Sequence, residues 1–167
     1  MRLDIPFISQ YDARVPESWR PRACSVTNLY MVLSFFNTTE NVTTTSLIQE
    51  GESIGAYGPR GWTHEGIVRL ARNHGIRAYA QEFRSSNTTC EEKLTTEGIE
   101  KIKEVLASGC PTIVSVQKEN GSYHTITVVG ESDVGFLCHD PEIGEYQEVS
   151  LETFLKRWRK LAIFFEV

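Results

Sequence analysis

The hydrophobic pattern of the chain changes at Pro111. Before this residue, apolar residues recur mainly at intervals of three and four, which is the period of an amphipathic helix. After it, short β-branched or aromatic runs are separated by turn-forming residues, as in antiparallel strands. Helices that precede strands, instead of alternating with them, favour an α+β fold over a doubly wound parallel sheet. We therefore predict an α+β chain.

Three helices are predicted in the N-terminal part. The first runs from about Cys24 to Phe36, where the apolar residues have helical spacing. The second begins after Thr63, a good N-cap residue, and stops at Gly75, a residue type that commonly ends helices. The third covers Glu97–Ser108. Two polar runs are interpreted as surface loops or helix starts: Asn37–Ser46 and Arg84–Glu92.

An antiparallel meander is predicted after Pro111. Its strands are the runs TIVSVQ, YHTITVVGE, VGFLCHD and EYQEVS, and the runs ENGS, ESD and PEIGE form the turns. A further strand, IRAYAQEF, is predicted before the third helix. The last helix covers Leu151–Arg159 after the N-cap Ser150, and the run AIFFEV closes the sheet.

The size and charge of the chain narrow its class. With 167 residues, of which 40% are hydrophobic and 23% charged, we predict one soluble domain over 1–167. The net charge of −5 argues against a nucleic-acid partner, because the one basic cluster, LKRWRK, fits the solvated side of a helix. There is no membrane span in the sequence and no signal-peptide core, so the expected location is cytoplasmic by default. A secreted form with a processed signal stays open.

The cysteines give no sign of a metal or redox motif. Cys24, Cys90, Cys110 and Cys138 show none of the CxxC spacing that is typical of structural zinc sites and thiol redox proteins. We predict free thiols, no bound metal and no other cofactor. A thiol redox or metal-binding protein ranks third among the functional hypotheses.

Cys24 lies where an irregular, proline-containing segment becomes a helix, in the run RPRACSVTNLYMVLSFF. The free N–H groups and the dipole of a helix N-terminus stabilise a thiolate, which is the nucleophilic form of cysteine. A histidine distant in sequence and close in space would complete the pair, and a third group would orient its ring.

His124 and Asp140 are the candidates for these two roles. His124 opens the predicted strand YHTITVVG, and on the next strand Cys138 and Asp140 share one face while His139 points to the other. A hairpin between the strands can therefore bring Asp140 beside His124 and keep His139 away. Asp140 precedes Pro141, where the chain must turn.

Each candidate also has a purely structural interpretation. Cys24 could be a small buried hydrophobic residue, and His124 a hydrogen-bonded strand residue. The tripeptide HDP could be an ordinary junction between a strand and a turn. His64 and His74 fit helix ends. A Cys/His/Asp zinc site is also possible, but catalytic zinc sites usually have more histidine ligands than this set offers. The spacing alone leaves these alternatives open.

Six segments, taken in their order, resemble the C39-like cysteine peptidases. They are IPFISQYD, CSVTNLYMVLSFF, GWTHEGIVRLARNHGIRA, LASGCPTIVSVQ, YHTITVVGE and CHDPEIGEYQEVSLETFLKRW, which together span Ile5 to Trp158. This papain-like family includes the leader-cleaving domains of bacteriocin exporters. The resemblance implies a papain-like fold in which N-terminal helices pack on a C-terminal antiparallel sheet.

The resemblance also implies roles for four residues. Cys24 would be the nucleophile, His124 the general base and then the general acid, and Asp140 the group that orients His124. The side-chain amide of Gln10 would join the Cys24 backbone N–H in stabilising the oxyanion. The implied activity is cleavage of a peptide or amide bond, in a peptide or protein substrate, through a thioester and without a cofactor.

The sequence departs from the family at Ser25, where glycine usually follows the cysteine. A side chain beside the oxyanion site could narrow the substrate range or weaken the enzyme. The alternative function is therefore a catalytically weak or inactive module that binds peptides or proteins. The run GAYGPRGW, Gly55–Trp62, could wall a substrate cleft. Hydrolysis, transpeptidation and deamidation would use the same three groups, so the sequence leaves the reaction and the oligomeric state open.

Overall fold

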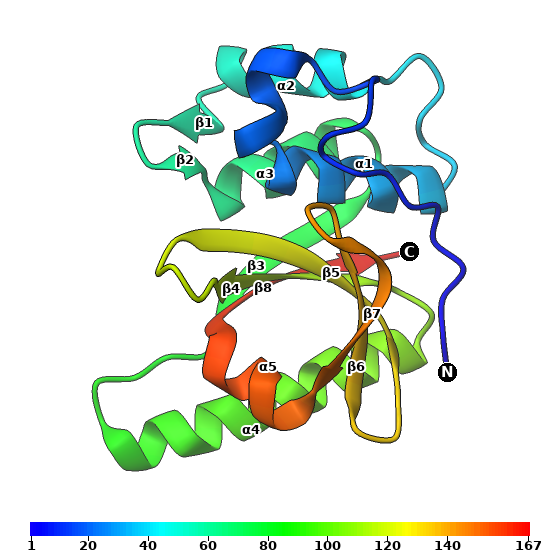
Figure 1. Ribbon diagram of the computed structural model, residues 1–167. Helices are drawn as coiled ribbons and strands as arrows, with labels where there is room; N and C mark the ends of the chain where they lie inside the picture. The colour runs from blue at the N-terminus through cyan, green and yellow to red at the C-terminus, as the bar shows by residue number, and fades with distance from the viewer.

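A six-stranded antiparallel sheet lies between two groups of helices in the computed structural model, which describes residues 1–167 (Figure 1). Its strands, in the order in which they pair, are β3 (Arg77–Glu82), β8 (Trp158–Glu166), β4 (Thr112–Gln117), β5 (Tyr123–Glu131), β6 (Gly135–Asp140) and β7 (Gly144–Ser150). The helices are η1 (Glu17–Arg22), α1 (Cys24–Phe35), α2 (Thr44–Ser53), α3 (His64–Asn73), α4 (Thr88–Ala107) and α5 (Leu151–Arg157). A separate hairpin joins β1 (Tyr57–Gly58) to β2 (Gly61–Trp62).

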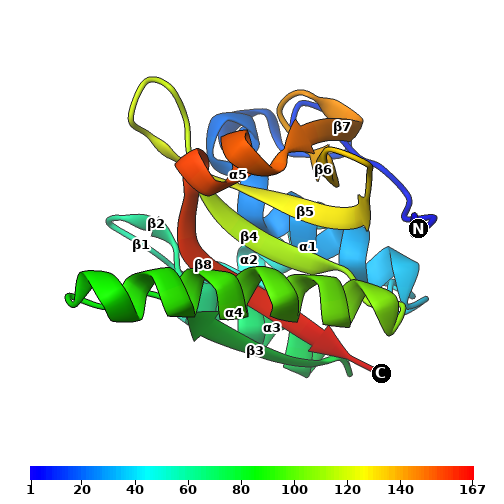
Figure 2. The same cartoon turned by 90° about the horizontal axis from the view of Figure 1, so that it is seen from below.

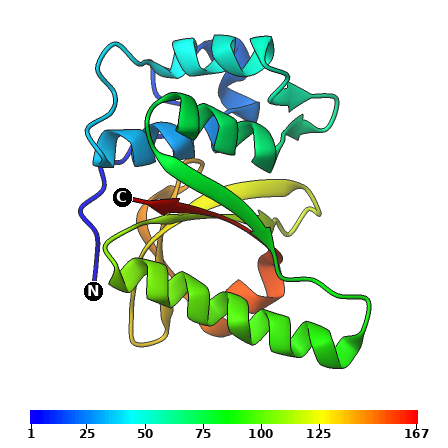
Figure 3. The ribbon, with the colours of Figure 1, turned by 180° about the vertical axis from the view of Figure 1, so that it is seen from behind.

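The helices form two layers. Helices α1, α2 and α3 cover one face of the sheet, and α4 and α5 lie on the other (Figure 1). Seen from below, α4 crosses in front of the sheet, with the helices of the first layer behind it (Figure 2). From behind, β3 descends from the first layer and leads through a loop to α4 (Figure 3). The α+β class predicted from the sequence is confirmed.

Strand alternation gives each layer its own hydrophobic core. Ile113 of β4 belongs to the core that α1, α2 and α3 share with the sheet. Its neighbours along the same strand, Val114 and Val116, belong to the core that includes Ile102 and Leu106 of α4. Successive side chains of a strand point to opposite faces, so β4 is apolar on both sides and lies in the middle of the sheet.

Several local predictions are confirmed. Strands β4 to β7 pair in sequence as an antiparallel meander. Helix α1 starts at Cys24, as predicted. The side chain of Thr63 caps α3 by accepting a hydrogen bond from the Gly66 N–H, and Gly75 follows that helix with a φ of +84°.

The two polar runs, 37–46 and 84–92, each contain the start of a helix. Helix α2 lies in a segment for which no complete helix was predicted, and the side chains of Thr43 and Ser46 form a capping box at its start. Helix α4 begins at Thr88 and not at Glu97, because the Asn87 side chain accepts hydrogen bonds from the first free N–H groups. The polar composition masked these helices, since most of their surface faces water.

The end of the last helix was predicted too late. Helix α5 stops at Arg157, and Trp158 already pairs with Val116 of β4. The Trp158 ring is buried in the core on the α4 side, which fixes the residue in the sheet. Strand β8 then lies between β3 and β4 and not at an edge. No helix of the structure has both the length and the apolar character needed to cross a membrane.

Candidate active site

Cys24 is the first residue of α1, and its thiol is half-buried at the helix N-terminus. The preceding residue, Ala23, offers no side-chain cap, so the first N–H groups of the helix have no partner within the protein. The thiol itself has one weak hydrogen bond, at 3.9 Å, with the Ser25 hydroxyl. The free N–H groups can therefore stabilise negative charge on the sulfur or on an atom bound beside it.

His124 and Asp140 form a buried pair. The Nε2–H of His124 donates to Oδ1 of Asp140 at 2.7 Å, and both residues are 4% exposed. Oδ1 also accepts the Glu142 backbone N–H at 2.9 Å, so the turn that follows β6 holds the carboxylate in place. This bond leaves Nδ1 of His124 free to exchange a proton with another group.

His139 lies away from this pair, as strand parity predicts. Its Nε2–H donates to the Ile5 carbonyl at 2.9 Å, and its Nδ1 accepts the Tyr146 backbone N–H at 3.1 Å. Burial is the main cause of a lowered pKa for His139. The ring is therefore a neutral structural residue whose two nitrogens are both satisfied.

The electrostatics couple Cys24 to His124. Burial raises the pKa of the Cys24 thiol, but the neighbouring His124 imidazole, aided by Thr125, outweighs burial and lowers that pKa overall. For His124, burial lowers the pKa, yet Asp140 and the Cys24 thiolate raise it to about 9. Burial likewise raises the pKa of Asp140, and its bond with His124 brings it below its ordinary value. The two shifts act together, because a thiolate on Cys24 and an imidazolium on His124 each stabilise the charge of the other.

Cys138 is an example of a buried thiol whose pKa no histidine lowers. Cys138 is fully buried, and burial together with the nearby Asp140 raises its pKa to about 12. All four cysteines are free thiols, and Cys90 is exposed. No group of three histidine, cysteine or acidic side chains is arranged to hold a metal ion.

Gln10 is buried between the two halves of this site. Its Nε2 donates to the Arg20 carbonyl at 2.8 Å, just before α1, and its backbone N–H donates to the Pro141 carbonyl at 2.8 Å, just after Asp140. Its Oε1 has no partner. The structure does not bring its amide into a hydrogen bond with Cys24, and Gln10 is not among the residues that line the cleft. One amide hydrogen remains free.

Asn28 is a site residue that the sequence analysis missed. Its Nδ2 donates to the carbonyls of Cys24 and Thr125, each at 2.8 Å, and its Oδ1 accepts the Thr127 hydroxyl at 2.6 Å. These bonds tie α1 to β5 directly beside His124. The available signal was an amide one turn after Cys24 in an otherwise mainly apolar helical run.

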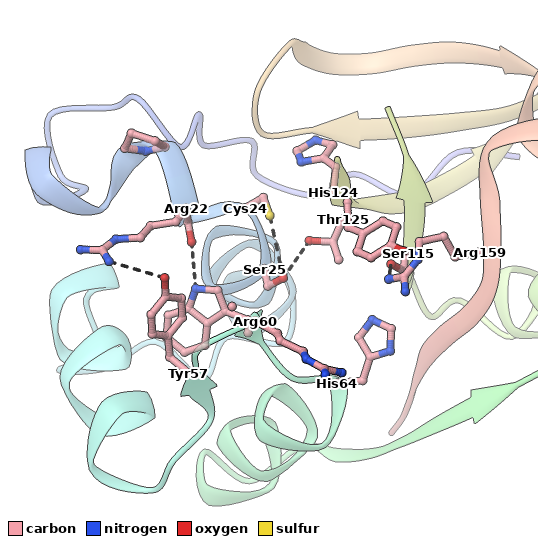
Figure 4. Close-up of a pocket in the computed structure, with 14 residues that line it drawn as sticks. Arg22, Cys24, Ser25, Tyr57, Arg60, His64, Ser115, His124, Thr125 and Arg159 are labelled. Carbon is pink, nitrogen blue, oxygen red and sulfur yellow. Dashed lines mark hydrogen bonds between the residues drawn. The ribbon is translucent and has the colours of Figure 1, made fainter. Parts of the chain in front are cut away.

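Cys24 and His124 both line a cleft of about 230 Å³ (Figure 4). The β1–β2 hairpin forms one wall with the side chains of Tyr57 and Trp62, as the predicted role of the run at 55–62 requires. The indole N–H of Trp62 donates to the Arg22 carbonyl at 2.9 Å, which attaches this wall to the segment before Cys24. Ser25 also faces the cleft, where its hydroxyl contacts that of Thr125 at 3.1 Å.

The family model described as the Peptidase_C39-like family matches residues 2–162. The chain belongs to this family. The match covers nearly the same span as the resemblance noted in the sequence. Comparison with curated protein sequences finds no match.

Solved structures of C39 peptidase domains share the fold of this family member. A double-glycine-motif protease from an AMS/PCAT transporter, solved with its leader peptide, is 18% identical and has a TM-score of 0.65 over 98% of this chain and 92% of that one. The peptidase domain of Streptococcus ComA, a bifunctional ABC transporter, is 21% identical with a TM-score of 0.67 over 95% of each chain. A Bacillus anthracis protein described as a C39-like peptidase is 17% identical with a TM-score of 0.68 over 98% and 95%. The predicted papain-like arrangement is thereby confirmed.

Proposed function

We propose that residues 1–167 form a single cysteine peptidase or amidohydrolase domain that cleaves a peptide or amide bond. The observation that carries this proposal is the buried 2.7 Å bond between His124 and Asp140 beside a thiol at a helix N-terminus. Membership of the Peptidase_C39-like family supports the reaction class. The leader peptide bound to the AMS/PCAT protease, which shares the fold, supports a peptide as the substrate.

In the proposed mechanism, the Cys24 thiolate attacks the substrate carbonyl carbon, and the carbonyl electrons move onto oxygen. The Cys24 backbone N–H stabilises this oxyanion, and the Gln10 amide joins it when its side chain turns from the Arg20 carbonyl toward the cleft. His124 gives its proton to the leaving nitrogen, the C–N bond breaks, and a thioester remains. Water then attacks the thioester and passes a proton to His124, and the acid leaves as the thiolate is restored.

The proposal is tested by the rate at which iodoacetamide alkylates Cys24 as a function of pH, followed by peptide mass spectrometry. In the wild type, Cys24 should react rapidly at pH 6, where an ordinary thiol of pKa about 8.5 is almost entirely protonated. In His124→Ala this rapid reaction should be lost. The exposed Cys90 in the same molecule serves as the comparison thiol.

Cleavage of a peptide mixture by the wild type, with Cys24→Ala as control, then tests turnover. Rapid labelling together with Cys24-dependent cleavage would support a peptidase. Rapid labelling without cleavage would favour the alternative of a weak or inactive binding module. The Ser25 hydroxyl in the cleft wall is the observation that favours this alternative. Slow labelling that His124→Ala leaves unchanged would overturn the proposal.

A further inference from the structure

The cleft beside Cys24 is positively charged although the protein is acidic. The chain carries a net charge of −5. Three arginines, Arg22, Arg60 and Arg159, nevertheless line the cleft, and no aspartate or glutamate does. A narrow space whose walls carry one sign of charge concentrates the field within it. The cleft therefore attracts groups of the sign opposite to that of its walls.

None of these three arginines has a carboxylate partner within the protein. Elsewhere, Arg14 pairs with Asp12 and Arg84 pairs with Glu82. By contrast, none of the nine ion pairs in the structure includes Arg22, Arg60 or Arg159. A guanidinium group is always charged and presents several N–H donors in a plane, so these donors remain available to a ligand.

Two of the arginines are held in place by aromatic rings. The Arg22 guanidinium lies over the Trp19 ring, 4.1 Å from its centroid. The Arg159 guanidinium lies 3.5 Å from the Tyr123 centroid and donates to the Ser115 hydroxyl at 2.9 Å. Stacking restricts these side chains while leaving their charge uncompensated. They can therefore meet a ligand with little further loss of freedom.

Arg60 is the least constrained of the three. It lies in the turn of the β1–β2 hairpin, is exposed, and makes no hydrogen bond, ion pair or aromatic contact in the structure. Figure 4 shows its side chain extending from the hairpin toward His64, with Arg159 on the facing wall. No group in the protein pairs with the Arg60 charge, so this charge is available to interact with a molecule that enters the cleft.

His64 also lines the cleft, and its pKa responds to the charge of one of these arginines, Arg159. Burial is the first cause of its lowered pKa, and the charges of Arg159 and Arg84 lower the pKa further. Glu82 is the one carboxylate that opposes this effect, and it is already bonded to Arg84 outside the cleft lining. The charge of Arg159 is thus not neutralised around His64.

We propose that this cleft selects peptides that carry a carboxylate next to the bond to be cleaved, bound by Arg60 and Arg159. This inference rests on the proposed peptidase function. The carboxylate belongs either to an aspartate or glutamate side chain or to a free C-terminus. An arginine fork matches either form, because it can donate two parallel N–H···O bonds to one carboxylate.

The test uses mixtures of decapeptides in which one position at a time is fixed as Glu, Gln or Lys, each with a free or an amidated C-terminus. Cleavage by the wild type is followed by mass spectrometry. Binding of the same mixtures to Cys24→Ala is measured separately by retention on the immobilised protein. We expect the Glu mixture to exceed the Gln mixture by about tenfold at one position, which corresponds to 1.4 kcal/mol. A preference for the free C-terminus alone would assign the carboxylate to the chain end.

Variants at Arg60 show whether the preference comes from the cleft. In Arg60→Gln the ratio of Glu to Gln should fall several-fold, and in Arg60→Glu the Lys mixture should become preferred. Arg77→Gln is the matched control, because it removes the same charge from an exposed residue outside the cleft, and it should keep the wild-type ratio. Since Arg60 contacts no other residue by a polar bond, these variants should fold.

The outcomes separate the two proposals. Cleavage or retention that is equal for Glu, Gln and Lys, or a Glu preference that Arg60→Gln leaves intact, would overturn the carboxylate site. If the wild type cleaves none of the mixtures but Cys24→Ala still binds the Glu mixture preferentially, the carboxylate site is supported and the peptidase function is overturned.

Discussion

Asn28 of α1 joins the carbonyl of Cys24 to that of Thr125, with 2.8 Å from its Nδ2 to each oxygen. Thr125 directly follows His124, so one side chain connects the helix of the thiol to the strand of the imidazole. Asn28 touches neither reacting group, and we regard it as a positioning residue. It is fully buried, and its Oδ1 also satisfies the Thr127 hydroxyl.

Asn28→Ala is expected to destabilise the protein and misalign the pair. Leaving buried partners unsatisfied costs about 1–3 kcal/mol each, so we expect a loss of about 2–4 kcal/mol in urea denaturation. The rapid alkylation of Cys24 at pH 6 should also slow, an effect that lower stability alone would not produce. Asn73→Ala, which removes one exposed bond to Glu50, should change stability by less than about 0.5 kcal/mol. An unchanged alkylation profile in Asn28→Ala would contradict the positioning role.

Asp140→Asn tests the carboxylate without changing its size. The variant removes the charge that raises the pKa of His124, so that pKa should fall and the Cys24 thiolate should lose its counter-ion at pH 6–8. We expect turnover to fall by about 10²–10⁴-fold, the range typical of a disturbed general acid and base. The measurement is the pH profile of alkylation and of peptide cleavage. A profile that matches the wild type would exclude an orienting role for Asp140.

The same pair makes stability depend on pH in a defined direction. The His124 pKa is raised to about 9, so its contribution is complete below its unfolded pKa of about 6.5 and is lost as pH rises through 9. The Asp140 pKa is lowered, so its contribution is lost as pH falls through the acidic range. The stability difference between wild type and His124→Gln should therefore be about 1–3 kcal/mol near pH 6 and shrink by pH 10. Urea denaturation at both pH values measures it, and a difference that grows with pH would refute the assignment.

Ser25→Gly should trade stability for space in the cleft. Glycine in the first helical turn and the lost contact with Thr125 together cost about 1–2 kcal/mol. Removing the side chain opens the wall next to Cys24, so kcat/KM for peptide mixtures should rise. Ser25→Ala separates the two effects, because it loses the hydroxyl and keeps the helix propensity. If neither variant raises kcat/KM, the Ser25 side chain does not restrict the substrate.

Gly98→Ala should destabilise the contact between α4 and β8. In an open helix the change would stabilise by about 1 kcal/mol. Here the added Cβ would lie 2.5 Å from the Trp158 ring and 2.9 Å from the Phe83 ring. Overpacking of this kind costs about 1–3 kcal/mol, so a net loss of up to about 2 kcal/mol is expected in urea denaturation. Gly58→Ala, with no atom within 4 Å of the added Cβ, is the control.

Periodicity identified the elements whose buried faces are regular. The strands of the meander and helices α1 and α3 repeat apolar residues at their own periods, and the parity of β5 and β6 correctly placed His139 away from His124. The family resemblance confirmed by the match over residues 2–162 supplied the packing of helices on sheet. The roles of Cys24, His124, Asp140 and Gln10 stay predictions.

Other features depend on contacts between distant segments, which periodicity does not describe. The bonds of Asn28 to β5, the buried position of Gln10 between Arg20 and Pro141, and the charge of the cleft all join residues far apart in sequence. Arg159 is an example, because it was interpreted as part of a solvated helix face. In the structure it lies in β8 and lines the cleft.

The place of β8 in the middle of the sheet affects when the site can be completed during synthesis. Among the sheet strands it is the last to leave the ribosome, yet it separates β3 from β4 and contributes Arg159 to the cleft wall. The thiol of Cys24 is made much earlier. A nascent chain therefore carries its nucleophile without a finished cleft until β8 has been synthesised and can pair between β3 and β4.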